Sequence, residues 1–119
     1  MAMQLDVTSL TNRFYGFRHG ESRANVEGII VSDPDLGTVE YGLSETGRGQ
    51  VLESASRLSR VVTDAVIVAS DFLRTVETAE MIRQVSGAEP VRLDSRLRER
   101  FFGKWEGARY THYSDACRV

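Results

Sequence analysis

The chain has 119 residues, which is the size of a single domain. Its 15 lysines and arginines against 17 aspartates and glutamates give a formal net charge of −2, and this near-balance argues against a nucleic-acid-binding surface, which carries a basic excess. Hydrophobic residues make up 41% of the chain and charged residues 27%, a composition that excludes a disordered or membrane-embedded protein. The longest apolar run, residues 65–69, is far too short to span a bilayer.

The N-terminus and the cysteine content favour a cytoplasmic protein. The first residues, MAMQLD, lack the charged start and apolar stretch of a signal peptide. The single cysteine, Cys117, has no partner for an internal disulfide or a cysteine-based metal site. We therefore expect one soluble cytoplasmic domain over residues 1–119, with residues 1–11 as a loose leader because they show no periodicity.

The first half of the chain predicts a strand, a loop and a helix. Residues 12–18 (NRFYGFR) are rich in aromatic side chains, which is typical of a strand. Residues 20–43 are rich in glycine and contain Asp-Pro-Asp, which indicates a long irregular loop, and such loops are usually functional. Ser44 is a good helix N-cap, and apolar residues then recur at helical spacing: Val51, Leu52, Ala55, Leu58, Val61 and Val62.

The second half predicts a strand, a helix and another strand. Residues 65–69 (AVIVA) have the pattern of a strand that is buried on both faces. Ser70 and Asp71 then open a second helix that stops at Gly87, and residues 91–93 form a short third strand. This order predicts an α/β fold with a parallel-rich sheet flanked by helices.

Candidate site residues follow two of the predicted strands. The sequence RHGE (residues 18–21) follows the first strand and SDFLR (residues 70–74) the second, and ligand sites in parallel sheets lie beyond such strand ends. Two arginines beside a histidine suit a phosphate monoester, because the planar guanidinium pairs with two phosphate oxygens and the imidazole can attack phosphorus. A histidine beside an arginine is more often a surface pair, so the spacing alone leaves both alternatives open.

Four landmarks in order resemble the histidine phosphatase superfamily, the phosphoglycerate mutase-like proteins that also include fructose-bisphosphatase-like enzymes. They cover residues 13 to about 107. The first two are Arg18-His19-Gly20-Glu21 with Asn25, and Leu43-Ser44-Glu45-Thr46-Gly47 with Gln50. The third and fourth are Ser70-Asp71-Phe72-Leu73-Arg74-Thr75 with Thr78-Ala79, and Leu97-Arg98-Glu99-Arg100 with Phe102-Gly103 and Glu106-Gly107.

The resemblance implies a role for each of five residues. His19 is the nucleophile that accepts the phosphoryl group, and Arg18 and Arg74 bind the phosphoryl oxygens. Asn25 adds a neutral hydrogen bond to the phosphate. Glu99 protonates the leaving oxygen and then activates the water that hydrolyses phosphohistidine. The family needs no metal or other cofactor for this reaction.

Other residues in the landmarks have a functional and a plain structural interpretation. Glu21 either supports the site or is a solvated acid. Arg98 and Arg100 either bind a second acidic group of the substrate or are surface charges, and Ser32 is a further candidate for phosphate contact. We expect packing roles, rather than stacking on a substrate, for the aromatic residues Phe101, Phe102 and Trp105.

The chain departs from the family at its far end. The family's site contains a second histidine, followed by glycine, on a strand that lies between the first strand and the strand equivalent to residues 66–68. His112 follows the fourth landmark too soon to be that residue, so we expect it at the surface or at a helix start. The resemblance therefore implies a domain truncated before its C-terminal strand. Direct pairing of the two exposed strand edges, self-association through them and a longer protein are the alternatives.

The resemblance implies a phosphatase that hydrolyses a small phosphate monoester through a phosphohistidine intermediate. The alternatives are a phosphoglycerate mutase-type phosphotransferase and a catalytically weak phosphate-binding fragment. Residues 28–35 and 97–103 resemble the phosphatase branch more closely. The expected partner is a small phosphorylated substrate, without nucleic acid or membrane.

Overall fold

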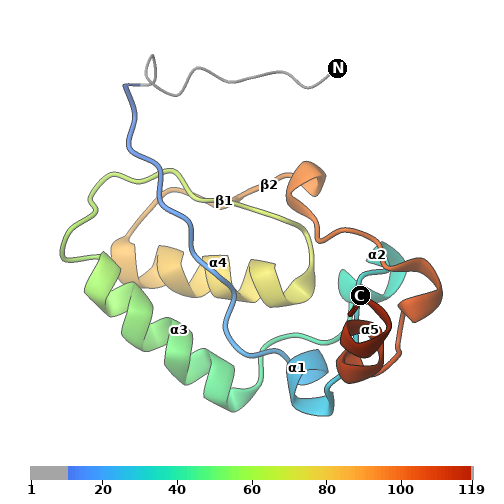
Figure 1. The fold of residues 1–119 in the computed structure, drawn as a ribbon. Coiled ribbons are helices and arrows are strands. Elements are labelled where there is room, and N and C mark those ends of the chain that lie inside the picture. The colour runs from blue at the N-terminus through green and yellow to red at the C-terminus, as the bar shows by residue number, and fades with distance from the viewer. Residues whose placement is uncertain (1–10, 119) are drawn as a thin grey trace.

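The computed structural model describes residues 11–118 (Figure 1). Residues 1–10 of the predicted leader lie outside the described residues. In chain order the elements are α1 (Arg23–Glu27), α2 (Pro34–Gly37), α3 (Glu45–Leu58), β1 (Val68–Ala69), α4 (Leu73–Ser86), β2 (Arg92–Leu93), the 3-10 helices η2 (Ser95–Leu97) and η3 (Gly103–Trp105), and α5 (Tyr110–Ala116).

The two long helices lie close to their predicted positions. The N–H of Gly47 donates to the Ser44 hydroxyl at 3.0 Å, which satisfies one of the free donors at the start of α3. Helix α4 begins slightly later than predicted, at Leu73, and its N-cap makes no side-chain hydrogen bond. It ends at Gly87 with φ at 69°, a left-handed conformation that glycine adopts without strain.

The α/β fold with parallel strands is confirmed. Strands β1 and β2 pair in parallel, with Val68 in register with Arg92. The helices α3 and α4 pack along each other, and the two strands lie over α4 (Figure 1). The small buried core draws on both helices and on the loops before them, and its fully buried apolar side chains include Val51, Ala55, Phe72 and Ala79.

The predicted first strand is wrong. Residues 12–18 form no regular secondary structure, although most of them line a hollow together with residues of α3, β1 and α4. A strand exists only where a neighbouring strand accepts and donates its backbone hydrogen bonds, and the sheet in the described residues consists of β1 and β2 alone. The aromatic pattern of residues 12–18 thus predicts an extended backbone, but it does not supply the neighbouring strand that a sheet requires.

Two further expectations need correction. The predicted irregular loop at residues 20–43 contains two short helices, α1 and α2, each begun by a capping side chain. The predicted strand at residues 65–69 shortens to β1 and is not buried on both faces, because Val66 and Val68 are 57% and 49% exposed. One face of this segment borders a hollow instead of a packed layer.

Candidate active site

His19 is half-buried and has one ring nitrogen fixed by the backbone. Its Nδ1 atom lies 2.7 Å from the carbonyl oxygen of Gly20. A carbonyl oxygen can only accept, so Nδ1 carries the proton and donates it. The other nitrogen, Nε2, therefore keeps its lone pair in the neutral ring, which is the form that can act as a nucleophile.

The peptide after His19 is tied to helix α4. The N–H of Gly20 donates to the Thr78 hydroxyl at 3.3 Å, and this hydroxyl donates to the carbonyl of Arg74 at 2.8 Å. Both Gly20 and Thr78 are buried. This relay links the loop that carries the histidine to the first turn of α4, so the two halves of the site keep a fixed spacing. The sequence places Thr78 in the third landmark but indicates no role for it.

Glycines allow helix α3 to approach the same loop closely. A Cβ atom on Gly20 would lie 2.5 Å from the carbonyl oxygen of Gly47, and one on Gly47 would overlap the backbone of Glu21. The Glu21 carboxylate accepts a hydrogen bond of 2.7 Å from the Ser44 hydroxyl, next to the start of α3. Glu21 thus supports the loop, as one of its two interpretations expects.

Arg74 is buried and held in place by its backbone contact. Arg74 is only 8% exposed. Its Nη1 donates a hydrogen bond to the carbonyl of Val31 at 2.9 Å. Its guanidinium carbon lies 4.9 Å from the centre of the Phe72 ring. Burial lowers the pKa of this guanidinium, and the charges of Glu99 and Glu106 act in the opposite direction. The group stays charged at neutral pH.

The charges of three other predicted site residues, Arg18, Arg74 and Glu99, act on His19. Burial is the main cause that lowers the pKa of His19, while its hydrogen bond to Gly20 raises it. The positive charges of Arg74 and Arg18 lower the pKa further, and the negative charge of Glu99 raises it. The net result is a pKa below the ordinary value of a histidine, which favours the neutral ring. Arg18 and Glu99 are themselves exposed.

Asn25 has a structural task at the start of helix α1. Its side-chain oxygen accepts hydrogen bonds from the backbone N–H and the hydroxyl of Ser22, at 2.9 and 3.0 Å, and its own N–H donates to that hydroxyl. These contacts form a capping box. They fix the amide so that its oxygen faces Ser22. The phosphate contact that the resemblance implies for Asn25 stays a prediction.

Ser32 and Glu106 form a network that sequence reasoning missed. The Glu106 carboxylate accepts from the backbone N–H of Ser32 at 2.8 Å and from its hydroxyl at 2.5 Å. The same hydroxyl accepts from the N–H of Phe102 at 3.0 Å. Ser32 is therefore buried in contacts within the protein. An acidic residue late in the chain carries no local signal for a contact with a serine that lies 74 residues earlier.

The two arginines that flank Glu99 both have partners within the protein. The guanidinium of Arg98 binds the Asp71 carboxylate through two hydrogen bonds. Arg100 donates to the hydroxyl of Tyr113 at 2.8 Å and lies over the ring of Phe102. These contacts support the structural interpretation of both residues over a direct role in substrate binding.

The remaining candidates lie where packing or solvent exposure explains them. Phe102 and Trp105 contact the ring of Tyr113 edge-on, as expected for packing residues, whereas Phe101 is 64% exposed. His112 is exposed in the first turn of helix α5, as its sequence position predicts.

Within residues 11–118, no group of three or more histidine, cysteine, aspartate or glutamate side chains is arranged to hold a metal ion. None of the helices in this described range has the length and apolar character that crossing a bilayer requires.

Comparison with known proteins gives a consistent set of relatives. A family model described as the histidine phosphatase superfamily (branch 1) matches residues 14–117. Glucosyl-3-phosphoglycerate phosphatase of Mycolicibacterium vanbaalenii is 34% identical over 95 residues, which cover 80% of this chain and 39% of the relative. The fructose-2,6-bisphosphatase TIGAR of Mus musculus is 40% identical over 93 residues, 76% of this chain and 33% of the relative.

A solved structure agrees with these relatives. The mycobacterial glucosyl-3-phosphoglycerate phosphatase in complex with VO3 superposes with a TM-score of 0.66 at 30% identity, over 83% of this chain and 46% of the other. The chain thus spans less than half the length of each of these three relatives. Since the family model covers nearly the whole chain, the chain belongs to the histidine phosphatase superfamily.

Proposed function

We propose that the protein is a phosphatase that hydrolyses a small phosphate monoester through a phosphohistidine intermediate. One observation carries the proposal: the ring of His19 donates Nδ1–H to Gly20, which leaves Nε2 as a nucleophile among the cationic groups of Arg18 and Arg74. A dianionic phosphate is attracted to the two guanidinium groups, and the neutral imidazole is the reactive form.

The reaction has two steps. First, Nε2 of His19 attacks phosphorus, the bond from phosphorus to the substrate oxygen breaks, and Glu99 in its protonated form gives its proton to that oxygen, so that an alcohol leaves and Glu99 becomes a carboxylate. Next, Glu99 takes a proton from water, the water oxygen attacks phosphorus, and the N–P bond breaks to release inorganic phosphate. Arg74 and Arg18 stabilise the charge on the transferring group in both steps, and the amide of Asn25 adds a hydrogen bond.

The buried position of Arg74 supports this assignment. A guanidinium with one edge held by the Val31 carbonyl presents its remaining N–H groups in a fixed direction, so little side-chain freedom is lost when phosphate binds. The names of the relatives fit the same substrate class, because two of them are phosphatases of phosphorylated sugars or sugar acids.

Phosphate release from an aryl phosphate ester tests the proposal. We expect His19→Ala to abolish release and to prevent the trapping of acid-labile phosphate, while His112→Ala stays within a few-fold of the unmodified protein. Acid-labile phosphate on His112 would contradict the assignment. Phosphate binding without release would instead support a phosphate-binding fragment, and exchange between mono- and bisphosphoglycerate would support a mutase-type phosphotransferase.

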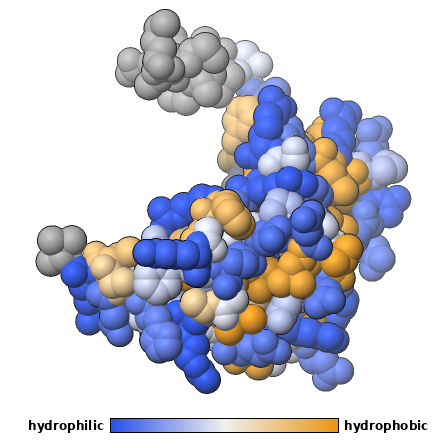
Figure 2. Space-filling view, turned by 90° about the vertical axis from the view of Figure 1, so that its right-hand side faces the viewer, coloured by the Kyte–Doolittle hydropathy of each residue, from blue (hydrophilic) through white to orange (hydrophobic). Residues whose placement is uncertain are grey.

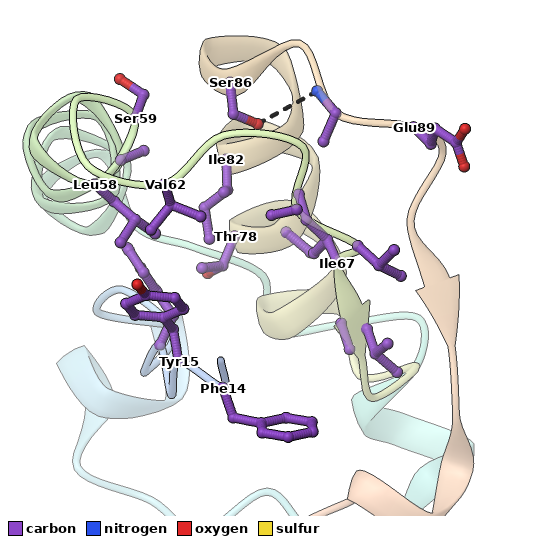
Figure 3. A pocket seen from close by; sticks show the side chains of 18 of the residues that line it. Phe14, Tyr15, Leu58, Ser59, Val62, Ile67, Thr78, Ile82, Ser86 and Glu89 are labelled. Atoms are coloured by element: carbon purple, nitrogen blue, oxygen red, sulfur yellow. Dashed lines mark hydrogen bonds between the residues drawn. The ribbon is translucent and has the colours of Figure 1, made fainter. Parts of the chain in front are cut away.

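We also propose that the protein self-associates through its sheet edge, with a second copy as the partner. A hollow of about 1110 Å³ lies between residues 12–19, the segment before α4 and the helices α3 and α4. Its labelled lining is mainly apolar and includes Tyr15, Leu58, Ile67 and Ile82 (Figure 3).

One edge of β1 has backbone N–H and C=O groups that can pair with another strand. The N–H groups of Arg92 and Asp94 donate to the carbonyls of Ile67 and Ala69, at 2.9 and 2.8 Å. Peptide groups alternate along a parallel strand, so the N–H and C=O of Val68 point to the opposite edge, where no further strand is paired within the described residues. A strand edge of this kind is a template for pairing with another chain.

Exposed apolar side chains also occur on this part of the surface. Apolar side chains of the described residues reach the surface at many points, as the orange areas in Figure 2 show. Val66 and Val68, at the β1 segment, are 57% and 49% exposed.

The cytoplasmic location stays a prediction.

A further inference from the structure

The proposed proton donor lies on a segment that has no regular structure of its own. Residues 98–102 connect η2 to η3, and Glu99 within them is exposed. Its carboxylate accepts a hydrogen bond from the N–H of the next residue, Arg100, at 3.0 Å. That local contact orients the side chain within the segment but does not fix the segment relative to His19.

The side chain of Arg98 joins this segment to the turn between β1 and α4. The guanidinium of Arg98 donates from Nε to one oxygen of Asp71 at 2.7 Å and from Nη2 to the other at 2.5 Å. Both side chains are about one-third exposed or less, at 33% and 27%. Two parallel hydrogen bonds fix the orientation of the guanidinium relative to the carboxylate as well as the distance between them.

The partner carboxylate belongs to the same turn as Arg74. Asp71 lies in the turn between β1 and α4, next to the buried Phe72 and three residues before the buried Arg74. Arg98 precedes Glu99 directly in the chain. The Arg98–Asp71 pair thus connects the segment of the proposed acid to the turn that delivers the phosphate-binding arginine.

We propose that Arg98 is a positioning residue: through its two-bond contact with Asp71 it holds residues 98–102 against the turn before α4, and so keeps the Glu99 carboxylate beside His19. The proposal rests on the role of Glu99 given above. Arg98 therefore acts in the site without contacting the substrate, and Asp71 anchors the Arg98 guanidinium. At the far end of the segment, the N–H of Phe102 is held by Ser32.

The titration of His19 reports the position of Glu99 without any need for activity. The groups whose charges act on the His19 ring are Arg74, Arg18 and Glu99, and of these Glu99 alone raises its pKa. The protein contains two histidines, so NMR spectra of the imidazole rings over a pH series give two titration curves. The exposed His112 is the internal reference.

The experiment compares variants of the full 119-residue chain. Glu99→Gln is expected to lower the pKa of His19, because a nearby negative charge is lost. Arg98→Met is expected to lower the pKa of His19 as well, because the Glu99 carboxylate then moves away from the His19 ring. Loss of a positive charge can only raise the pKa of a histidine that it reaches, so a decrease identifies the displacement of Glu99. In the double variant the decrease should not exceed that of Glu99→Gln alone.

Arg96→Met is the matched control. Arg96 makes an equivalent paired contact, but with Asp94, only two residues earlier in the chain, and its side chain is 88% exposed. It should leave the titration of His19 unchanged. If Arg98→Met does not fold, Arg98→Lys keeps the cation, loses the planar fork, and should give a smaller decrease that is absent in the Glu99→Gln background.

The outcomes separate this inference from the proposed function. No effect of Glu99→Gln on His19 would contradict the site itself. A decrease with Glu99→Gln but none with Arg98→Met, or an equal decrease with Arg96→Met, would overturn the positioning role and leave the site intact. A decrease with Arg98→Met that persists in full when Glu99 is already glutamine would also overturn it.

Discussion

Gly47 in helix α3 faces the backbone of Glu21 so closely that a Cβ atom would overlap the Glu21 carbonyl oxygen. This contact places the first turn of α3 directly behind the loop that carries His19. The close approach explains why glycine stands in a helix, where it costs roughly 0.5–1 kcal/mol relative to alanine.

Alanine substitution within α3 tests this contact, because the helix contains a second glycine in open space. We expect Gly47→Ala to lower the free energy of unfolding by about 1–3 kcal/mol, since the loop or the helix must shift. Gly49 has no neighbour that a Cβ atom would meet, so Gly49→Ala should raise stability by roughly 0.5–1 kcal/mol. Urea unfolding measures both, and equal effects of the two substitutions would contradict the close approach.

Lysine is not a conservative replacement for the two phosphate-binding arginines. Arg18→Lys and Arg74→Lys keep the charge but lose the planar fork. Each should reduce turnover by at least about tenfold, which corresponds to ~1.4 kcal/mol of transition-state stabilisation. Arg57→Lys, in an exposed pair with Glu53 on α3, is the control and should have no effect. Unchanged kinetics in both site variants would mean that these arginines do not hold the transferring group.

The stability of the protein should depend on pH through His19. Burial holds the folded-state pKa of His19 below its ordinary value, so the folded protein binds this proton less readily than the unfolded chain. The free energy of unfolding therefore has its full value, as far as His19 is concerned, above the unfolded-state pKa of about 6.5. It decreases as the pH falls through the lower folded-state pKa of His19. Urea unfolding at pH 7.5 and in steps down to pH 5 should show this loss. His19→Gln should remove that part of the pH dependence, and His112→Gln should retain it.

Self-association should depend on the edge of β1. We expect the unmodified protein to elute from a size-exclusion column as a species larger than its 13.3 kDa monomer, in a concentration-dependent manner. Val68→Lys places a charge at the strand edge, which opposes edge pairing, and should shift the protein to monomer.

Val39→Lys is the control for self-association, since Val39 is 66% exposed and lies outside the hollow. A monomer at all concentrations would reject the interface. Dissociation by Val39→Lys with none by Val68→Lys would show that the interface lies elsewhere.

Local sequence determined much of what surrounds the site. Ser44 predicts the start of α3 because its hydroxyl satisfies a free N–H in the first turn, and Gly87 predicts the end of α4 because it adopts a left-handed conformation. The motif residues Arg18, His19, Arg74 and Glu99 were identified by resemblance, and their charges act on one another in the structure.

Tertiary structure alone decided which of these residues have partners and which strands form. The aromatic pattern of residues 12–18 predicted a strand, but a strand needs hydrogen bonds from a neighbour, and that neighbour is a property of the whole sheet. The pairing of Arg98 with Asp71 and of Ser32 with Glu106 joins residues that lie 27 and 74 positions apart. Contacts at such separations leave no periodic or local signal in the sequence, because they depend on how the chain folds back on itself.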